Sequence, residues 1–184
     1  MKVDQNSFLE LYKPVHDAFA RFCHAKAYGL VEPEDLISES ITCALERFHT
    51  LKNEKAFLSF LFSIASNLVH KQNRRLKFRA GEQHLDDLEK ASTQLGGDDL
   101  MDVKLLYEAL AQLPEKVEEA LILFEISGFS IKEVAKIQKA GESAVKQRLK
   151  RGRMKLAELL GADELKQEST SKRSPYLMSV FLSF

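Results

Sequence analysis

Apolar residues recur at helical spacing along most of the chain, and no stretch alternates apolar and polar residues as a half-buried strand does. Over residues 7–28, for example, aromatic and aliphatic side chains return every three or four positions. The same periodicity predicts helices over residues 7–28, 33–48, 55–78, 99–112, 114–127, 131–139 and 142–157. The sequence is therefore expected to fold as an all-α protein.

Several of these predicted helices have characteristic end signals. Gly29 and Gly128 suit the left-handed conformation that often terminates a helix. Pro33 suits a first helical position, and Asn53 can cap the third helix. Pro14 is expected either to shift the start of the first helix or to kink it, because proline lacks a backbone N–H.

Residues 128–157 predict two helices joined by a tight turn. Ser130 and Glu133 have the spacing of a capping box at the start of the first helix. The second helix has its expected core positions at Val145, Leu149, Gly152 and Leu156, and its cations are Lys146, Arg148, Lys150, Arg151, Arg153 and Lys155. This combination is typical of a helix-turn-helix DNA reader. An ordinary surface helix with a basic polar face remains the alternative.

Charge is segregated along the chain although the formal net charge is zero. Residues 71–79 are basic, whereas residues 82–102 are strongly acidic. Residues 80–98 combine these acids with glycines and few large apolar groups, which indicates a flexible linker. We therefore predict a helical domain over 1–79, a linker over 80–98, a helix-turn-helix domain over 99–161 and a tail of unassigned role over 162–184.

Two further helix faces are candidate binding surfaces. On the second helix Asp35, Glu39, Thr42 and Glu46 form an acidic stripe, which is either a solvated face or a docking strip for a basic partner. On the third helix one face carries Phe60, Ser63, Asn67, His70, Lys71 and Arg74. An aromatic ring, an amide and cations together suit unpaired bases and their phosphates. Burial of Phe60 in the core is an equally good interpretation.

The sequence offers little for catalysis or for metal binding. Cys23 and Cys43 fall in predicted helices, where small buried side chains are the default, and the histidines are scattered. No nucleophile–base pair, carboxylate pair or phosphate-binding glycine loop is apparent. We therefore expect no enzyme activity, no metal and no cofactor. The lack of a signal peptide and of a long apolar run predicts a cytoplasmic protein without membrane insertion.

Two blocks of sequence stand in a suggestive order on either side of the acidic linker. One comprises Asp35–Ser40, Phe57–Leu68 and the pair Arg74-Arg75, and the other comprises Leu110–Glu115, Gly128-Phe129-Ser130 and Ala144–Arg151. The first resembles region 2, and the second is similar to region 4, of the small alternative sigma factors of bacterial RNA polymerase. These are the extracytoplasmic-function group of the sigma-70 family. Together the blocks span most of residues 8–160.

This resemblance implies a function and a set of contacts. Core RNA polymerase would be bound through the clamp helices of its β′ subunit and through its β flap, and the region 2 residues implied are Asp35, Leu36, Ser38, Glu39 and Thr42. Promoter DNA would be opened at the −10 element by region 2 and read at the −35 element by region 4. The DNA contacts implied are Phe60, Asn67, His70, Lys71, Arg74, Arg75, Ser143, Lys146, Gln147, Arg148, Lys150, Arg151 and Arg153. An anti-sigma factor is a possible further partner.

The chain departs from the family pattern at four positions. Phe60 stands where relatives often have Trp, and Lys71 where an Asp is frequent. Lys139 replaces the glycine expected in the turn between the reader helices. Gly152 lies inside the last helix, where glycine costs about 1 kcal/mol relative to Ala.

Two other function classes remain as alternatives. A dimeric transcription regulator of the response-regulator output type would have a similar reader but would leave residues 30–78 unexplained. A purely protein-binding helical adaptor would tolerate loss of the basic groups.

Overall fold

The computed structural model describes residues 5–80 and 97–161, and every regular element in these two ranges is helical. The first half contains α1 (Gln5–Tyr12), η1 (Lys13–Val15), α2 (His16–Ala27), α3 (Pro33–Arg47), η2 (Phe48–Thr50), η3 (Glu54–Ala56) and α4 (Phe57–Ala80). The second half contains α5 (Gly97–Ala111), α6 (Glu115–Leu121), the π-helical turn η4 (Ile122–Ile126), α7 (Ile131–Ile137) and α8 (Glu142–Leu159). The prediction of an all-α fold is thereby confirmed for the described residues.

Most of the predicted helix ends are found where the sequence signals placed them. Gly29 and Gly128 have φ of 68° and 82°, and Pro33 is the first residue of α3. Asn53 accepts a hydrogen bond from the backbone N–H of Lys55 at the start of η3. Pro14 lies in the 3-10 turn η1, so the single helix expected over 7–28 is divided into α1 and α2.

Aromatic rings fill the core of the first half. Phe19 and Phe22, both on α2 and fully buried, meet the ring of Phe62 on α4 edge to face. Phe8 of α1 contacts Phe57 of α4 in the same geometry. Edge-to-face pairs are a favoured arrangement of aromatic quadrupoles, so α4 is fixed against α1 and α2 along much of its length.

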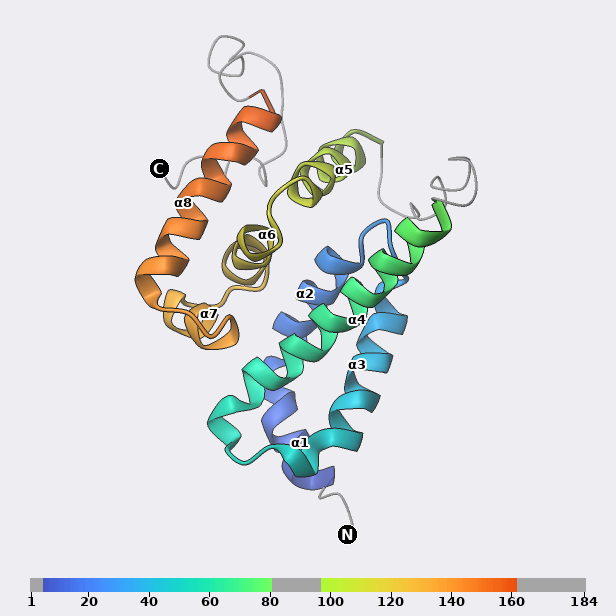
Figure 1. The fold of residues 1–184 in the computed structure, drawn as a ribbon, viewed down its shortest axis with the longest axis vertical. Coiled ribbons are helices and arrows are strands. Elements are labelled where there is room, and N and C mark those ends of the chain that lie inside the picture. Colours follow the sequence, from blue (N-terminus) through green and yellow to red (C-terminus); the bar gives the residue numbers. More distant parts are fainter. Residues whose placement is uncertain (1–4, 81–96, 162–184) are drawn as a thin grey trace.

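The second half packs directly on the first. In Figure 1, α6 and α7 lie between α8 on one side and α2 with α4 on the other. The ring of Phe129 in the second half reaches Phe62, with ring centroids 5.2 Å apart. Arg21 of α2 donates to the carbonyl oxygens of Ile126 and Ser127 at 3.0 and 2.9 Å. The two halves therefore share apolar and polar contacts in this arrangement.

A nearly buried ion pair adds to this contact between the halves. The Lys26 Nζ atom on α2 lies 2.8 Å from Glu118 Oε2 on α6, and the side chain of Lys26 is 4% exposed. The predicted linker, 80–98, lies almost wholly outside the described residues, as does the predicted tail, 162–184. The proposed division into domains thus stays a prediction.

Candidate nucleic-acid interface

The exposed face of α4 is assembled on a helix whose opposite face is buried in the first half. Phe57, Leu61 and Ala65 form the buried stripe. On the other side Asn67, Lys71, Arg74 and Arg75 are exposed, while Phe60, Ser63 and His70 are half-buried. The structure therefore brings the predicted region 2 residues onto one helix, with the amide and three of the cations open to solvent.

Two residues of this face are less free than the sequence indicated. Phe60 packs partly against the core. Its ring is therefore neither fully exposed for contact with bases nor fully buried, the two alternatives that the sequence left open. The His70 Nε2 atom lies 2.9 Å from Glu115 Oε1 at the start of α6. His70 therefore contacts the second half in this arrangement, and its predicted contact with DNA stays a prediction.

The helix-turn-helix forms as the sequence predicted. The side chain of Ser130 accepts from the Glu133 N–H, and the Glu133 carboxylate accepts from the Ser130 N–H, which completes the capping box. Lys139 in the following turn has φ of 49°, a left-handed conformation that favours glycine. Lys139 therefore adopts the conformation for which a glycine was expected at this position.

The core face of α8 is also confirmed, since Val145, Leu149 and Leu156 are buried against the rest of the helix-turn-helix. Gly152 allows close packing of α8 against α6 at this face. A Cβ atom at this position would lie 2.6 Å from Leu121 Cδ1 and 2.8 Å from Val117 Cγ1. Only glycine lets α8 approach α6 this closely, so the residue is a packing requirement as well as a helix penalty.

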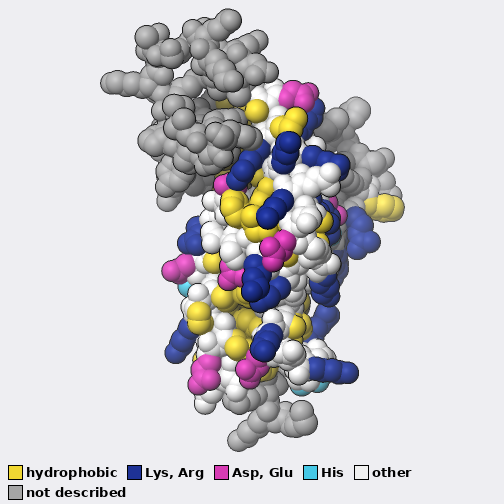
Figure 2. All heavy atoms as spheres, turned by 90° about the vertical axis from the view of Figure 1, so that its left-hand side faces the viewer, with side chains coloured by type: hydrophobic (Ala, Val, Ile, Leu, Met, Phe, Trp, Pro, Cys, Tyr) yellow, Lys and Arg dark blue, Asp and Glu magenta, His cyan; other side chains and the backbone are white. Residues whose placement is uncertain are grey.

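The outward face of α8 carries five of the predicted contact residues in exposed positions: Ser143, Lys146, Gln147, Lys150 and Arg151. Figure 2 faces the side on which α8 lies and shows Lys and Arg side chains along most of its height, with acidic side chains between them. The remaining two, Arg148 and Arg153, are half-buried. The predicted contact cations of α8 therefore form two groups: an open group, Lys146, Lys150 and Arg151, and a bonded group, Arg148 and Arg153.

Both guanidinium groups of the bonded group have identified partners. Arg148 Nη1 donates to Gln138 Oε1 at 2.7 Å. Arg153 donates to Glu125 Oε1 from Nε at 2.8 Å and lies over the Phe124 ring. Sequence spacing gave no signal for either arrangement, because Gln138 lies in the turn after α7 and Glu125 and Phe124 lie in η4.

Gln138 is part of a larger polar network centred on Glu119, a buried carboxylate on α6. Gln138 Nε2 donates to Glu119 Oε2 at 3.0 Å, as does Lys116 Nζ at the same distance. Ser66 of α4 donates to Glu119 Oε1 at 2.9 Å. Burial raises the pKa of Glu119, but the charge of Lys116 and the hydrogen bonds from Lys116, Ser66 and Gln138 outweigh it, so the net pKa is lowered. The network links α4 to the Arg148 side chain.

The acidic stripe of α3 is exposed as the sequence indicated. Asp35, Ser38, Glu39 and Thr42 are all open to solvent, and Thr42 Oγ1 donates to the backbone oxygen of Ser38. Leu36 is 3% exposed and faces the core, so it supports the stripe from beneath. A direct contact between Leu36 and a partner stays a prediction.

Among residues 5–80 and 97–161, no group of three or more His, Cys, Asp or Glu side chains is arranged to hold a metal ion. Cys23 is buried, and burial raises the pKa of its thiol to about 12. No helix in these ranges is long and apolar enough to cross a membrane.

Comparison with known proteins identifies the family. The family described as Sigma-70, region 4, matches residues 104–156, from α5 to near the end of α8. The extracytoplasmic-function (ECF) RNA polymerase sigma factor BldN of Streptomyces coelicolor is 30% identical over 166 residues, which cover 87% of this chain and 62% of BldN. The chain belongs to the extracytoplasmic-function group of the sigma-70 family.

Other relatives in this group agree. The ECF sigma factor EcfG of Rhodopseudomonas palustris is 28% identical, with 71% of this chain and 72% of EcfG covered. SigX of Bacillus subtilis is also 28% identical, with 80% of each chain covered. Matches of this extent include residues of both halves of the chain, whereas a reader shared with response regulators would account only for the second.

Solved structures of sigma factors have the same fold. The structure of RpoE in complex with the anti-sigma factor NepR from Bartonella quintana superposes with a TM-score of 0.60 and 28% identity, covering 87% of this chain and 98% of that one. CnrH in complex with the cytosolic domain of CnrY gives a TM-score of 0.60 at 23% identity, which bears on the fold alone.

Proposed function

We propose that this sigma factor binds core RNA polymerase and directs initiation at a specific set of promoters. The observation that carries the proposal is the simultaneous exposure of an acidic stripe on α3 and of basic faces on α4 and α8. Opposite charge on separate faces suits a chain that holds a basic protein surface while it contacts DNA phosphates. The acidic stripe would bind the clamp helices of the β′ subunit, and the second half would contact the β flap.

The two basic faces would divide the promoter between them. On α8 the exposed Lys146, Gln147 and Lys150 would approach base edges of the −35 element, and Arg151 would hold phosphate. On α4, Asn67 and the neighbouring cations would bind the −10 element once it is unpaired. Unpairing costs a few kcal/mol per flipped base, and stacking and pocket contacts offset that cost. No covalent chemistry, metal or cofactor is needed.

The family also suggests a regulator and a location. Two of the solved structures with this fold are complexes, one with an anti-sigma factor and one with the cytosolic domain of CnrY. An anti-sigma factor is therefore a possible partner of this chain. A cytoplasmic location follows from its proposed work with polymerase and DNA.

The test combines core binding with transcription in vitro. Purified chain is mixed with core polymerase, and start sites are mapped on genomic DNA templates. The double variant Asp35→Arg and Glu39→Arg reverses the acidic stripe and should abolish core binding while leaving the circular dichroism spectrum unchanged. The control, Glu10→Arg with Asp17→Arg, makes the same change in charge at exposed positions on α1 and α2 and should bind core normally. Tight dimeric binding to duplex DNA without core association would instead favour the response-regulator class.

A further inference from the structure

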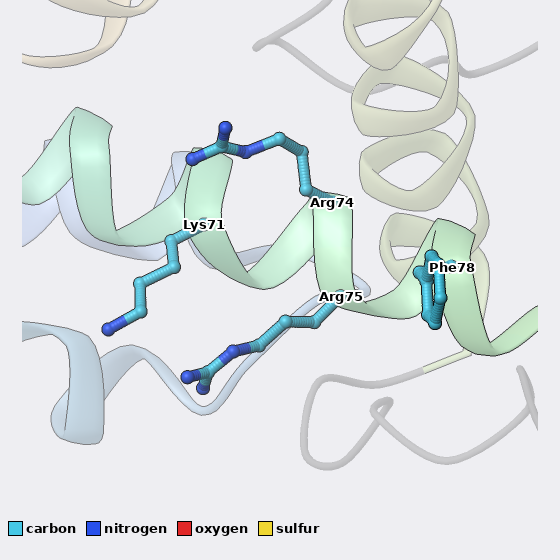
Figure 3. A pocket seen from close by; sticks show the side chains of 4 residues that line it. All are labelled: Lys71, Arg74, Arg75 and Phe78. Atoms are coloured by element: carbon cyan, nitrogen blue, oxygen red, sulfur yellow. The ribbon is translucent and has the colours of Figure 1, made fainter.

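The last two turns of α4 carry a face that the rest of the described structure does not cover. Lys71, Arg74, Arg75 and Phe78 follow one another at helical spacing and line one open hollow. Figure 3 shows the three cationic side chains extending along the helix away from Phe78, whose ring stands at the far end. The face therefore presents a bare ring beside a group of cations.

Phe78 is the most exposed large apolar side chain among the described residues, at 73%. No aromatic pair within those residues includes it, in contrast with the many rings paired in the first half. Burying a Phe side chain contributes roughly 1.5–3 kcal/mol, which an exposed ring forgoes. A ring left open at this position is thus available to a ligand.

The cations beside it are available as well. Lys71, Arg74 and Arg75 are exposed, and none forms an ion pair within 4.0 Å with an acidic side chain that the structure describes. Three unpaired cations on two turns of one helix attract an anionic chain. Since each residue adds about 1.5 Å along a helix, the face from Lys71 to Phe78 spans about 10 Å. That length equals about three nucleotides of a strand that keeps the duplex spacing of 3.4 Å, and fewer of a more extended strand.

An aromatic ring next to backbone-holding cations is the combination that binds single-stranded nucleic acid, because every base can stack and every phosphate carries charge. An acidic peptide would satisfy the cations but would offer a flat group to the ring only where its sequence includes an aromatic side chain. The face also continues the one that carries Asn67, one turn before Lys71.

We propose that Phe78 is a stacking platform for one unpaired DNA base, with Lys71, Arg74 and Arg75 holding the adjoining phosphates. The family resemblance already implies DNA contacts for Lys71, Arg74 and Arg75, so the new element of this site is Phe78, which extends the α4 surface by one turn. The inference rests on the proposed function to the extent that promoter DNA supplies the single strand.

The experiment measures binding of the full-length chain, without polymerase, to fluorescent 12-nucleotide single strands and to the same sequence as a duplex. Phe78→Ala should weaken single-strand binding about tenfold and change duplex binding less than twofold. Phe78→Trp should retain or improve single-strand binding, because the larger ring still stacks. Leu105→Ala removes another exposed apolar side chain, 45% exposed on α5, and should leave both affinities unchanged.

Several results would overturn the proposal. If Phe78→Ala binds the single strand as the wild type does, or weakens duplex and single-strand binding alike, no base stacks on the ring. Failure of Phe78→Trp to bind would also contradict stacking, because the larger ring offers at least as much surface to a base. A poly-glutamate peptide that displaced the oligonucleotide and lost affinity with Phe78→Ala would assign the face to an acidic protein partner.

The oligonucleotide result is separable from the proposed function. Failure to bind core polymerase would refute the sigma activity and leave the stacking measurement intact. Conversely, a normal transcription assay combined with an unchanged Phe78→Ala affinity would refute only the stacking site.

Discussion

The exposed faces of α4 and α8 are both rich in cations, yet they use these residues differently. On α4 the side chains of Lys71, Arg74 and Arg75 extend into solvent without an acidic partner among the described residues. On α8 the guanidinium groups of Arg148 and Arg153 are bonded within the second half. A cation on a predicted DNA-binding helix therefore supports DNA contact only when no other side chain of the protein is bonded to it.

The difference follows from the size of the two supporting structures. α4 is a long helix whose final turns extend past the packed aromatic core of the first half. α8 lies on short helices, so its half-buried cations need local partners to offset the loss of water. The second half therefore uses some of its basic residues for stability. Three predictions test this difference between the cations of α4 and those of α8.

The largest expected effect concerns the contact that holds α8 in place. Gly152→Val inserts a branched side chain where a single Cβ would already lie 2.6 Å from Leu121 Cδ1. Overpacking of this kind costs about 2–3 kcal/mol, which denaturant unfolding would measure. The control Gly141→Ser adds a side chain where nothing lies within 4 Å and where serine is a good helix cap, and it should be neutral or stabilising. Equal stability of both variants would mean that α8 and α6 are further apart than described.

The second prediction compares one arginine from each helix. Arg153→Ala leaves the half-buried Glu125 carboxylate without its donors and should cost about 2 kcal/mol of unfolding free energy. Arg75→Ala removes an exposed side chain and should change stability by less than about 0.5 kcal/mol. For DNA affinity we expect the reverse order, because Arg75→Ala would remove the proposed phosphate contact and flatten the salt dependence. A large loss of stability in Arg75→Ala would remove the distinction between the two faces.

Local signals in the sequence predicted much of this fold. The capping box at Ser130, the terminating glycines Gly29 and Gly128 and the core positions Val145 and Leu149 all depend on neighbours within a few residues. Such features follow from backbone geometry and periodicity, which the sequence displays directly. The exposed stripe of α3 was predictable for the same reason.

The features that the sequence did not reveal depend on distant partners. Gly152 is a penalty in an isolated helix, and its role appears only when Leu121 of α6 is placed against it. Arg153 resembles any other cation of α8 until Glu125 is found beside it, and Leu36 resembles its exposed neighbours until α3 is packed. The contacts between the halves, such as Lys26 with Glu118, join residues that are 92 positions apart.

The smallest expected effect is a dependence of the unfolding free energy on pH. It arises from Glu119, which is linked through Gln138 to Arg148 of α8. The net pKa of Glu119 is lowered in the folded chain from its ordinary value of 4.5. A carboxyl group with a lowered pKa stabilises the fold above its unfolded-state pKa, and this contribution is lost as the pH falls through the folded pKa. Glu119→Gln should therefore be less stable than the wild type at pH 7, and the difference should shrink as the pH falls below 4.5.

Ser66→Ala sharpens this test because it keeps the Glu119 carboxylate and removes one of its donors. It should give a difference of the same sign and smaller size when the free energy of unfolding is followed from pH 7 to pH 3. A difference that stays constant, or grows in acid, would mean that Glu119 is not held by these donors. Since Gln138 bonds to both Glu119 and Arg148, protonation of Glu119 should also loosen Arg148. No such carboxylate is paired with Lys71, Arg74 or Arg75 among the described side chains, so acid should leave these three side chains unchanged where it loosens Arg148.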